Sequence, residues 1–395
     1  MRKMLAIAAL CSLVAVSTGA TAGPTDGFNS DNVEYVTYVP FEAGTATGAK
    51  AIGKYLYVTS WKDFSIYDLS DPEAPELLSK TLFLEDTAEQ GTGFRFENED
   101  VATNGRILVF SQQLPVAHVF VYDIEDKTNP VLIGHLTEGG AHTAECLLDC
   151  KWLYSSNGNI IDLRDPTKPK LLEEKWTTDS PITSAHDVNE VAPGLVLTSS
   201  RPVMVLDARK DPVHPKIVAL GDDDAITGGI HSNRWPRKAK DDIVLFSSES
   251  NGTGRCTGDN GAFMTWDASK YKKTKTLTLL DVYQLQNGTY SDGAPPVNGL
   301  GCSAHWFQEH RTFHNGGLVA MGSYEHGTRF VDVASNGKIK EVGWFVPNGG
   351  STSARLLDQR PDRLRGRLLE RDRRPPLHRQ VLTRAEVAPS QSRSR

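Results

Sequence analysis

The chain has 395 residues, of which 39% are hydrophobic and 23% charged, and its formal net charge is -6 at pH 7. This length is enough for one large core or two ordinary domains, and the composition is that of a globular rather than a disordered chain. The acidic balance excludes the basic surface with which most proteins bind nucleic acid, so we expect no nucleic-acid partner.

The first 22 residues have the features of an export signal. Two basic residues precede an apolar run over residues 4–17, and Ala20-Thr21-Ala22 forms an A-x-A cleavage site before Gly23. The apolar run is too short to cross a hydrocarbon layer of about 30 Å, and no later segment is apolar enough to span a membrane. We therefore predict a signal peptide over residues 1–22 and a secreted, extracellular monomer that begins at Gly23.

One pattern then recurs along the chain: an apolar strand, a short turn, a second strand that ends in Asp, and a turn that contains Pro. Clear copies cover residues 55–80, 107–135, 152–175 and 195–221, and looser copies begin at Ile243 and Leu318. A further strand precedes each copy, which gives about four strands per unit. Repeats of about 40–50 residues made of several short strands are typical of β-propeller blades. We predict an all-β chain with a single β-propeller domain over residues 23–354, in which the strand-ending aspartates open turns.

The first copy also carries a resemblance to a known family. Residues 55–75 read YLYVTSWKDFSIYDLSDPEAP and resemble an LVIVD repeat, the motif of a family of exported bacterial β-propellers. Five further copies follow with decreasing fidelity, so the resemblance extends over residues 45–345. It implies a propeller fold, and it implies no particular activity, because the function of that family is uncharacterised.

The two ends of the domain suggest that a blade is missing. The spacing of the units, and an unrepeated strand over residues 33–40, indicate a seven-bladed design in which this strand completes the last blade and closes the ring. Residues 355–395 do not resemble a blade, because they contain twelve arginines, five acidic residues and no strand periodicity. We predict that a frameshift near Ala354 removed the seventh blade and left an aberrant or disordered tail over residues 355–395. A natural basic tail is the alternative.

Four cysteines remain once the signal peptide is removed. An even number of cysteines in an exported chain indicates disulfide bonds. We predict a Cys146–Cys150 bond across a tight turn and a Cys256–Cys302 bond that closes the long insertion of the fifth unit.

Histidines recur at the start of successive innermost strands. His142, His186, His231 and His305 occupy this position, and Glu99 occupies it one unit earlier, because NEDVAT aligns with AHDVNE. Equivalent positions in successive blades lie on a ring around the propeller axis, so these five residues are candidate ligands of a transition metal ion on that axis. The alternative is a structural histidine, copied by duplication, that bonds to the neighbouring blade.

Two functions are compatible with this pattern. The first is a scaffold without catalysis that binds an unknown extracellular ligand or protein. The second is a metal-dependent oxidoreductase with its axial histidine cluster in the propeller channel. The chain contains no G-x-S-x-G elbow, P-loop or H-E-x-x-H motif, so the sequence assigns no catalytic residue and does not decide whether the protein is an enzyme.

Overall fold

The structure is a computed structural model that describes most of the chain between residues 28 and 346. The described residues are 28–36, 39, 46–60, 63–82, 99–113, 117–226, 228–249, 261–285, 303–324, 326–346 and 384–385. The predicted signal peptide, Cys256, Cys302 and nearly all of the Arg-rich tail lie outside them. The predictions about these segments therefore stay predictions.

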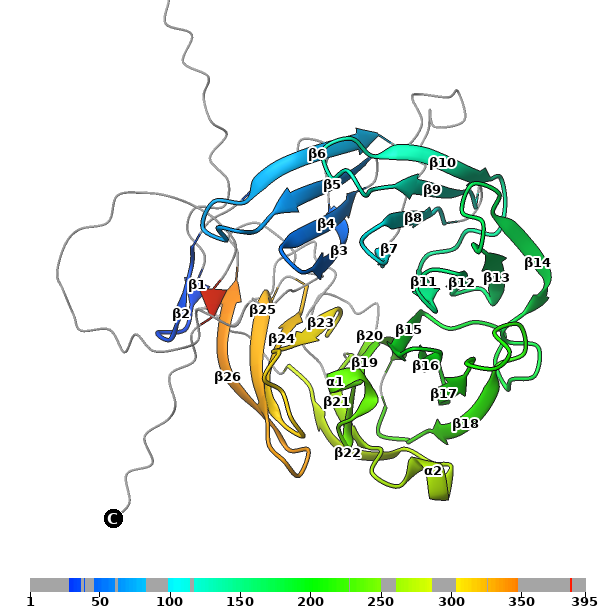
Figure 1. Cartoon of the computed structure of the whole chain (residues 1–395). Coiled ribbons are helices and arrows are strands. Elements are labelled where there is room, and N and C mark those ends of the chain that lie inside the picture. Colours follow the sequence, from blue (N-terminus) through cyan, green and yellow to red (C-terminus); the bar gives the residue numbers. More distant parts are fainter. Residues whose placement is uncertain are drawn as a thin grey trace, which may run out of the picture.

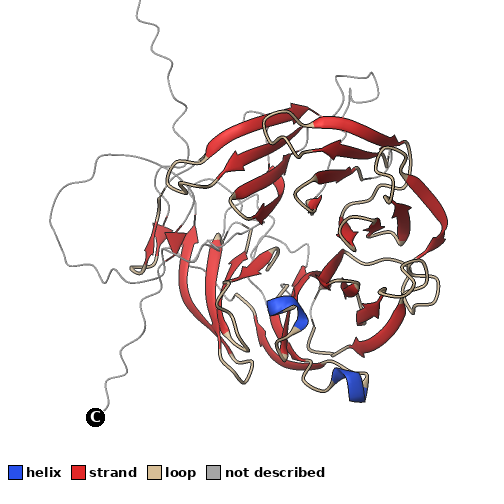
Figure 2. Ribbon diagram, viewed as in Figure 1, coloured by secondary structure: helices blue, strands red, loops and turns tan. Residues whose placement is uncertain are grey.

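Six antiparallel sheets surround a common axis and form a β-propeller (Figures 1 and 2). In each blade the first strand in sequence is the innermost, and the next three follow outward. The strands of the first three blades are β3 (Ala46–Ile52), β4 (Tyr55–Ser60), β5 (Asp63–Asp68), β6 (Glu76–Leu82), β7 (Ala102–Thr103), β8 (Ile107–Ser111), β9 (Val119–Asp123), β10 (Val131–Leu136), β11 (Ala144–Leu147), β12 (Trp152–Ser155), β13 (Asn159–Asp162) and β14 (Lys170–Lys175).

The other three blades are built in the same way. Their strands are β15 (Asp187–Ala192), β16 (Leu195–Ser199), β17 (Val203–Asp207), β18 (Lys216–Gly221), β19 (Gly229–Arg234), β20 (Ile243–Glu249), β21 (Phe263–Asp267), β22 (Thr278–Tyr283), β23 (Phe307–Glu309), β24 (Gly317–Gly322), β25 (Thr328–Val333) and β26 (Ile339–Val346). Two single-turn helices, α1 (Pro236–Ala239) and α2 (Tyr271–Thr274), lie in the connections of the fifth blade. Among the described residues, neither helix has the length or the apolar run needed to cross a bilayer.

The repeat in the sequence corresponds to the blade, so the predicted all-β propeller is confirmed. The strand-ending aspartates act in turns as predicted. The side chains of Asp68, Asp123 and Asp162, for example, each accept a hydrogen bond from the backbone N–H two residues later, at 2.6, 2.9 and 3.0 Å. Each aspartate thus stabilises the turn that ends its strand and leads to the outermost strand of the blade.

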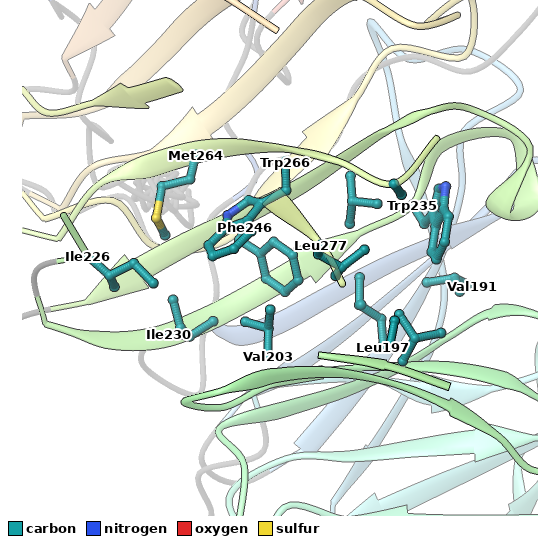
Figure 3. Close-up of a cluster of buried hydrophobic side chains, with 14 of the residues drawn as sticks. Val191, Leu197, Val203, Ile226, Ile230, Trp235, Phe246, Met264, Trp266 and Leu277 are labelled. Carbon is teal, nitrogen blue, oxygen red and sulfur yellow. The ribbon is translucent and has the colours of Figure 1, made fainter. Parts of the chain in front are cut away.

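The hydrophobic core is divided among the seams between neighbouring blades. Figure 3 shows the seam between the fourth and fifth blades, where Leu197 and Val203 pack against Phe246 and Trp266. Comparable clusters fill the seams between blades one and two, two and three, three and four, and five and six. At the seam between blades six and one, the described residues instead form two separate small clusters. One contains Val33 and packs on the sixth blade, and the other lies on the first blade.

An N-terminal strand extends the sixth blade, but not the strand that the sequence suggested. Strand β1 (Phe28–Asn29) pairs with β26 as a fifth, outermost strand, and the register aligns Phe28 with Val346. Strand β2 (Val33–Glu34), which lies in the segment predicted to close the ring, pairs with β27 (Arg384–Ala385) of the tail. The predicted closing position was thus wrong by a few residues, because the alternating pattern over residues 33–40 is stronger than that of the short β1.

The described residues form six blades, which agrees with the prediction that the seventh blade is missing. Residues 347–383, where a seventh blade would have to begin, lie outside the described residues. The frameshift is a statement about the gene and stays a prediction.

One of the two predicted disulfides lies within the described residues, and the structure forms it. Cys146 and Cys150 are bonded with their Cα atoms 4.4 Å apart, across the turn between β11 and β12. Leu148, Asp149 and Cys150 in this turn all have positive φ angles, at 52°, 65° and 56°. The bond therefore holds three consecutive residues in the left-handed backbone region, which residues other than glycine rarely adopt.

Candidate metal centre

The five residues predicted to share a site come from five consecutive blades and meet near the axis. Each lies within three residues of the start of an innermost strand: Glu99 before β7, His142 before β11, His186 before β15, His231 in β19 and His305 before β23. The regular blade repeat is what brings them together, because equivalent positions of the innermost strands surround the axis at one level.

The four imidazole rings form a continuous row. The ring centres of His142 and His186 are 4.9 Å apart, those of His186 and His231 are 3.8 Å apart, and those of His231 and His305 are 3.7 Å apart. His231 and His305 are buried, whereas His142 and His186 are half-buried. The row therefore runs from a partly solvated end to a fully buried end.

Glu99 lies against three of these rings. Its Oε2 atom is 3.5 Å from Nε2 of His142, 3.3 Å from Nε2 of His231 and 3.7 Å from Nε2 of His305. The indole nitrogen of Trp306 donates a hydrogen bond to the same oxygen at 3.1 Å. Trp306 thus fixes the carboxylate among the histidines.

A second carboxylate, which the sequence did not indicate, faces the same row. Glu249 ends β20, and its Oε1 is 3.9 Å from Nε2 of His305. The hydroxyl of Tyr324 donates a hydrogen bond to this oxygen, and the Tyr324 ring centre is 4.7 Å from that of His305. Glu249 is on the second strand of its blade and has no counterpart in the other units, so no repeat signal could have revealed it.

The six side chains fall into three groups of potential metal ligands. Each group contains two histidines and one carboxylate whose ligand atoms all lie within 4.8 Å of one another. The groups are Glu99–His142–His186, Glu99–His231–His305 and His186–His231–Glu249. Two histidines and one carboxylate with open positions form a known ligand set of non-haem iron(II) sites, and nitrogen and oxygen ligands of this kind also suit other first-row metals.

Burial places these groups in the protonation state that metal binding requires. Burial, together with the neighbouring His305, lowers the pKa of His231 to about 3. Burial and the neighbouring His231 also lower the pKa of His186 well below its usual value. Burial alone would raise the pKa of Glu99, but its interactions with His142, His231 and His305 outweigh burial, and the pKa lies well below its usual range. Neutral imidazoles of His186 and His231 beside an ionised Glu99 carboxylate are the forms that bind a metal ion.

The histidine row also contains buried nitrogen atoms that the protein does not satisfy. Within the described part of the chain, Nδ1 of His186 and Nδ1 of His231 have no hydrogen-bond partner. A buried polar atom without a partner costs free energy, so such atoms call for an external partner such as an ion or a water molecule.

Charged residues also line the innermost strands away from the histidines, and we call them the ionic cluster. Each of the six blades contributes one member: Lys50, Asp100, Glu145, Asp187, Arg234 and Glu309. Both carboxylate oxygens of Glu145 accept hydrogen bonds from Nζ of Lys50, at 3.1 and 2.9 Å. The charges of Asp100, Arg234, Glu145 and Lys50 all act on Asp187. The sequence analysis missed this cluster, because its members differ in sign and do not occupy one repeat position.

Comparison with known proteins supports the architecture. The model of the LVIVD repeat matches residues 43–81, which contain the first blade. No curated protein sequence matches the chain. Among solved structures, the periplasmic gluconolactonase of Pseudomonas aeruginosa is similar, with 11% identity, a TM-score of 0.53, and coverage of 76% of this chain and 84% of the other.

A protein described as a putative 6-phosphogluconolactonase from Bacteroides uniformis is also similar, with 11% identity, a TM-score of 0.49, and coverage of 77% of this chain and 82% of the other. At 11% identity, the likeness to the gluconolactonase shows the propeller fold alone.

Proposed function

We propose that this propeller, which carries an LVIVD repeat in its first blade, is a metal-dependent oxidoreductase with a transition metal ion among its axial histidines. One observation carries the proposal: six side chains from five blades form groups of two histidines and one carboxylate within metal-binding reach of one another. Structural histidines that bonded separately to neighbouring blades would have no reason to gather in this way.

In such a centre, some residues of the chain would bind the ion and others would orient its ligands. Histidine nitrogens and carboxylate oxygens hold the ion, and Trp306 and Tyr324 orient Glu99 and Glu249 by hydrogen bonds. Hydrogen bonds of this type fix ligand direction and basicity. When bound, an ion held by three protein ligands offers open positions for a substrate and for redox chemistry.

Elemental analysis of the purified full-length chain tests this proposal directly. We expect at least one equivalent of a first-row transition metal per chain, which is reduced in His186→Ala and retained in His135→Ala. His135 is a suitable control, because it lies on the outside of the second blade, where its Nε2 is 3.3 Å from Nδ1 of His118. A wild-type chain that stays metal-free after incubation with iron(II), manganese(II), zinc or copper would overturn the proposal.

A binding scaffold without catalysis is the second candidate, and one feature of the outer surface favours it. Leu77 of β6 and Val131 and Leu132 of β10 are 50%, 49% and 43% exposed, on the outermost strands of two neighbouring blades. Exposed apolar side chains on outermost strands are accessible to a binding partner. This candidate requires no bound metal, so the same elemental analysis separates the two.

A further inference from the structure

The two carboxylates of the candidate metal centre each connect two pairs of histidines. Glu99 forms one group with His142 and His186 and another with His231 and His305, and these two groups share no other residue. Glu249 forms a group with one histidine of each pair, His186 and His231. Both acidic side chains therefore lie between the pairs rather than at one end of the row.

Distances exclude a single ion that all four histidines bind in this arrangement. Imidazole nitrogens and carboxylate oxygens bind transition metals at about 2.0–2.2 Å, so two ligand atoms on one ion are at most about 4.4 Å apart. The ligand atoms of each group of three lie within 4.8 Å of one another, which is close to this limit. Among the described residues, however, no group contains more than two of the four histidines. One ion would leave two buried imidazoles without a metal.

We propose that the centre holds two metal ions, one bound by His142 and His186 and the other by His231 and His305, with the Glu99 carboxylate bridging them. This inference rests on the proposed function, since it concerns the number of ions in the same site. The Oε2 atom of Glu99 lies between the pairs, 3.5 Å from Nε2 of His142 and 3.3 Å from Nε2 of His231. Paired ions in proteins lie about 3.5–4 Å apart. Glu249 faces a histidine of each pair and is the second candidate bridge.

Titration of the metal-free full-length chain with manganese(II) tests this inference. We expect two equivalents per chain by equilibrium dialysis, and an electron paramagnetic resonance spectrum of two coupled ions instead of the spectrum of isolated manganese(II). One equivalent with the spectrum of an isolated ion would overturn the inference and leave the proposed function standing. No binding of manganese(II), iron(II), zinc or copper would overturn both.

Variants at the two ends of the row provide the second measurement. His142→Ala removes a ligand from one pair only, so we expect its stoichiometry to fall from two ions to one and the coupling to disappear. His305→Ala makes the same test from the other pair if the first variant is not secreted. His135→Ala should keep both ions. Two coupled ions in His142→Ala or in His305→Ala would contradict the assignment of ligands.

Discussion

The histidine row and the ionic cluster are both built from the innermost strands of the same blades, but they satisfy their polar groups differently. In the ionic cluster, Lys50 donates to both oxygens of Glu145, so charges of opposite sign meet within the protein. In the histidine row, Nδ1 of His186 and of His231 has no partner among the described residues. Burial lowers the pKa of His186 and of His231 and so favours their neutral forms.

The paired part of the ionic cluster, Lys50 and Glu145, holds two innermost strands in place and needs nothing from solution. Oδ1 of Asp187 in the same cluster has no partner among the described residues, so the contrast rests on this pair. A buried cluster that lacks partners is costly, and it persists where a ligand supplies the missing interactions. The following experiments change one region at a time, so that each should affect either metal content or stability.

The largest effect is expected for metal content. His186→Ala should remove at least one bound ion per chain, because His186 belongs to two of the three ligand groups. Its half-buried position means that the truncation should leave the yield of folded protein largely intact. Elemental analysis of the variant, with His135→Ala as control, measures this. Full metal content in His186→Ala would show that the row is not the site.

The ionic cluster should respond in the opposite way, with a large change in stability and none in metal content. Lys50→Met leaves the buried carboxylate of Glu145 without its cation, which should lower the free energy of unfolding by roughly 3–5 kcal/mol. The double variant Lys50→Met, Glu145→Leu removes both charges and should recover most of that loss. Denaturant titration of the three proteins checks this. An unchanged denaturation midpoint in Lys50→Met would show that the Lys50–Glu145 pair contributes nothing to stability.

Removal of the bound metal should lower the free energy of unfolding, and this effect should depend on the histidine row. A ligand that binds the folded state at 100 times its dissociation constant stabilises that state by about 2.7 kcal/mol. We therefore expect the melting temperature to fall when a chelator removes the metal, and to rise again on reloading. His186→Ala should show a smaller response, and a chelator-induced shift of unchanged size in this variant would place the metal elsewhere.

A smaller effect is expected when only the support of a ligand is removed. Trp306→Phe keeps an aromatic ring but removes the N–H that bonds to Glu99. Loss of such a supporting hydrogen bond typically weakens metal affinity by about 10–100-fold. Trp344→Phe, in β26 of the same blade, is the matched control. Equal affinity in the two variants would mean that Glu99 does not need the indole.

The smallest effect concerns the pH dependence of stability in the ionic cluster. Burial raises the pKa of Glu145 from 4.5 to about 8, against the attraction of Lys50 and with a further rise from Asp100. Because the folded pKa lies above the unfolded one, the contribution of this group is complete below about pH 4.5 and is lost as the pH rises through about 8. The free energy of unfolding should thus decrease over that range, with a shallower slope in Glu145→Gln. Parallel slopes would contradict the raised pKa.

Much of the fold could be predicted because its signal is local and repeated. Strand, turn, Asp and Pro recur in each unit, so the blades follow from the pattern, and the positions of Asp68 or Asp123 at the ends of strands followed with them. The histidines and Glu99 could also be placed around the axis, since a repeat position maps to one level of the propeller.

The arrangement of the site could not be predicted in the same way. The grouping of ligands in threes depends on the direction of each side chain, which repeat position does not determine. Glu249 and Tyr324 reach the row from β20 and from the residues after β24, where no other blade has an equivalent. The pairing of β1 with β26 could not be predicted either, because a two-residue strand has too little periodicity to be recognised in the sequence.

The pairing of Phe28 with Val346 also has a consequence for the order in which the molecule folds. Each blade is made of neighbouring segments and can form as soon as those segments are available, whereas β1 must wait for β26, the last strand of the sixth blade. The ring is therefore expected to close late in folding. The same edge, where the described residues form only small clusters, is expected to open first, so its amides should exchange with solvent faster than those of the other five seams.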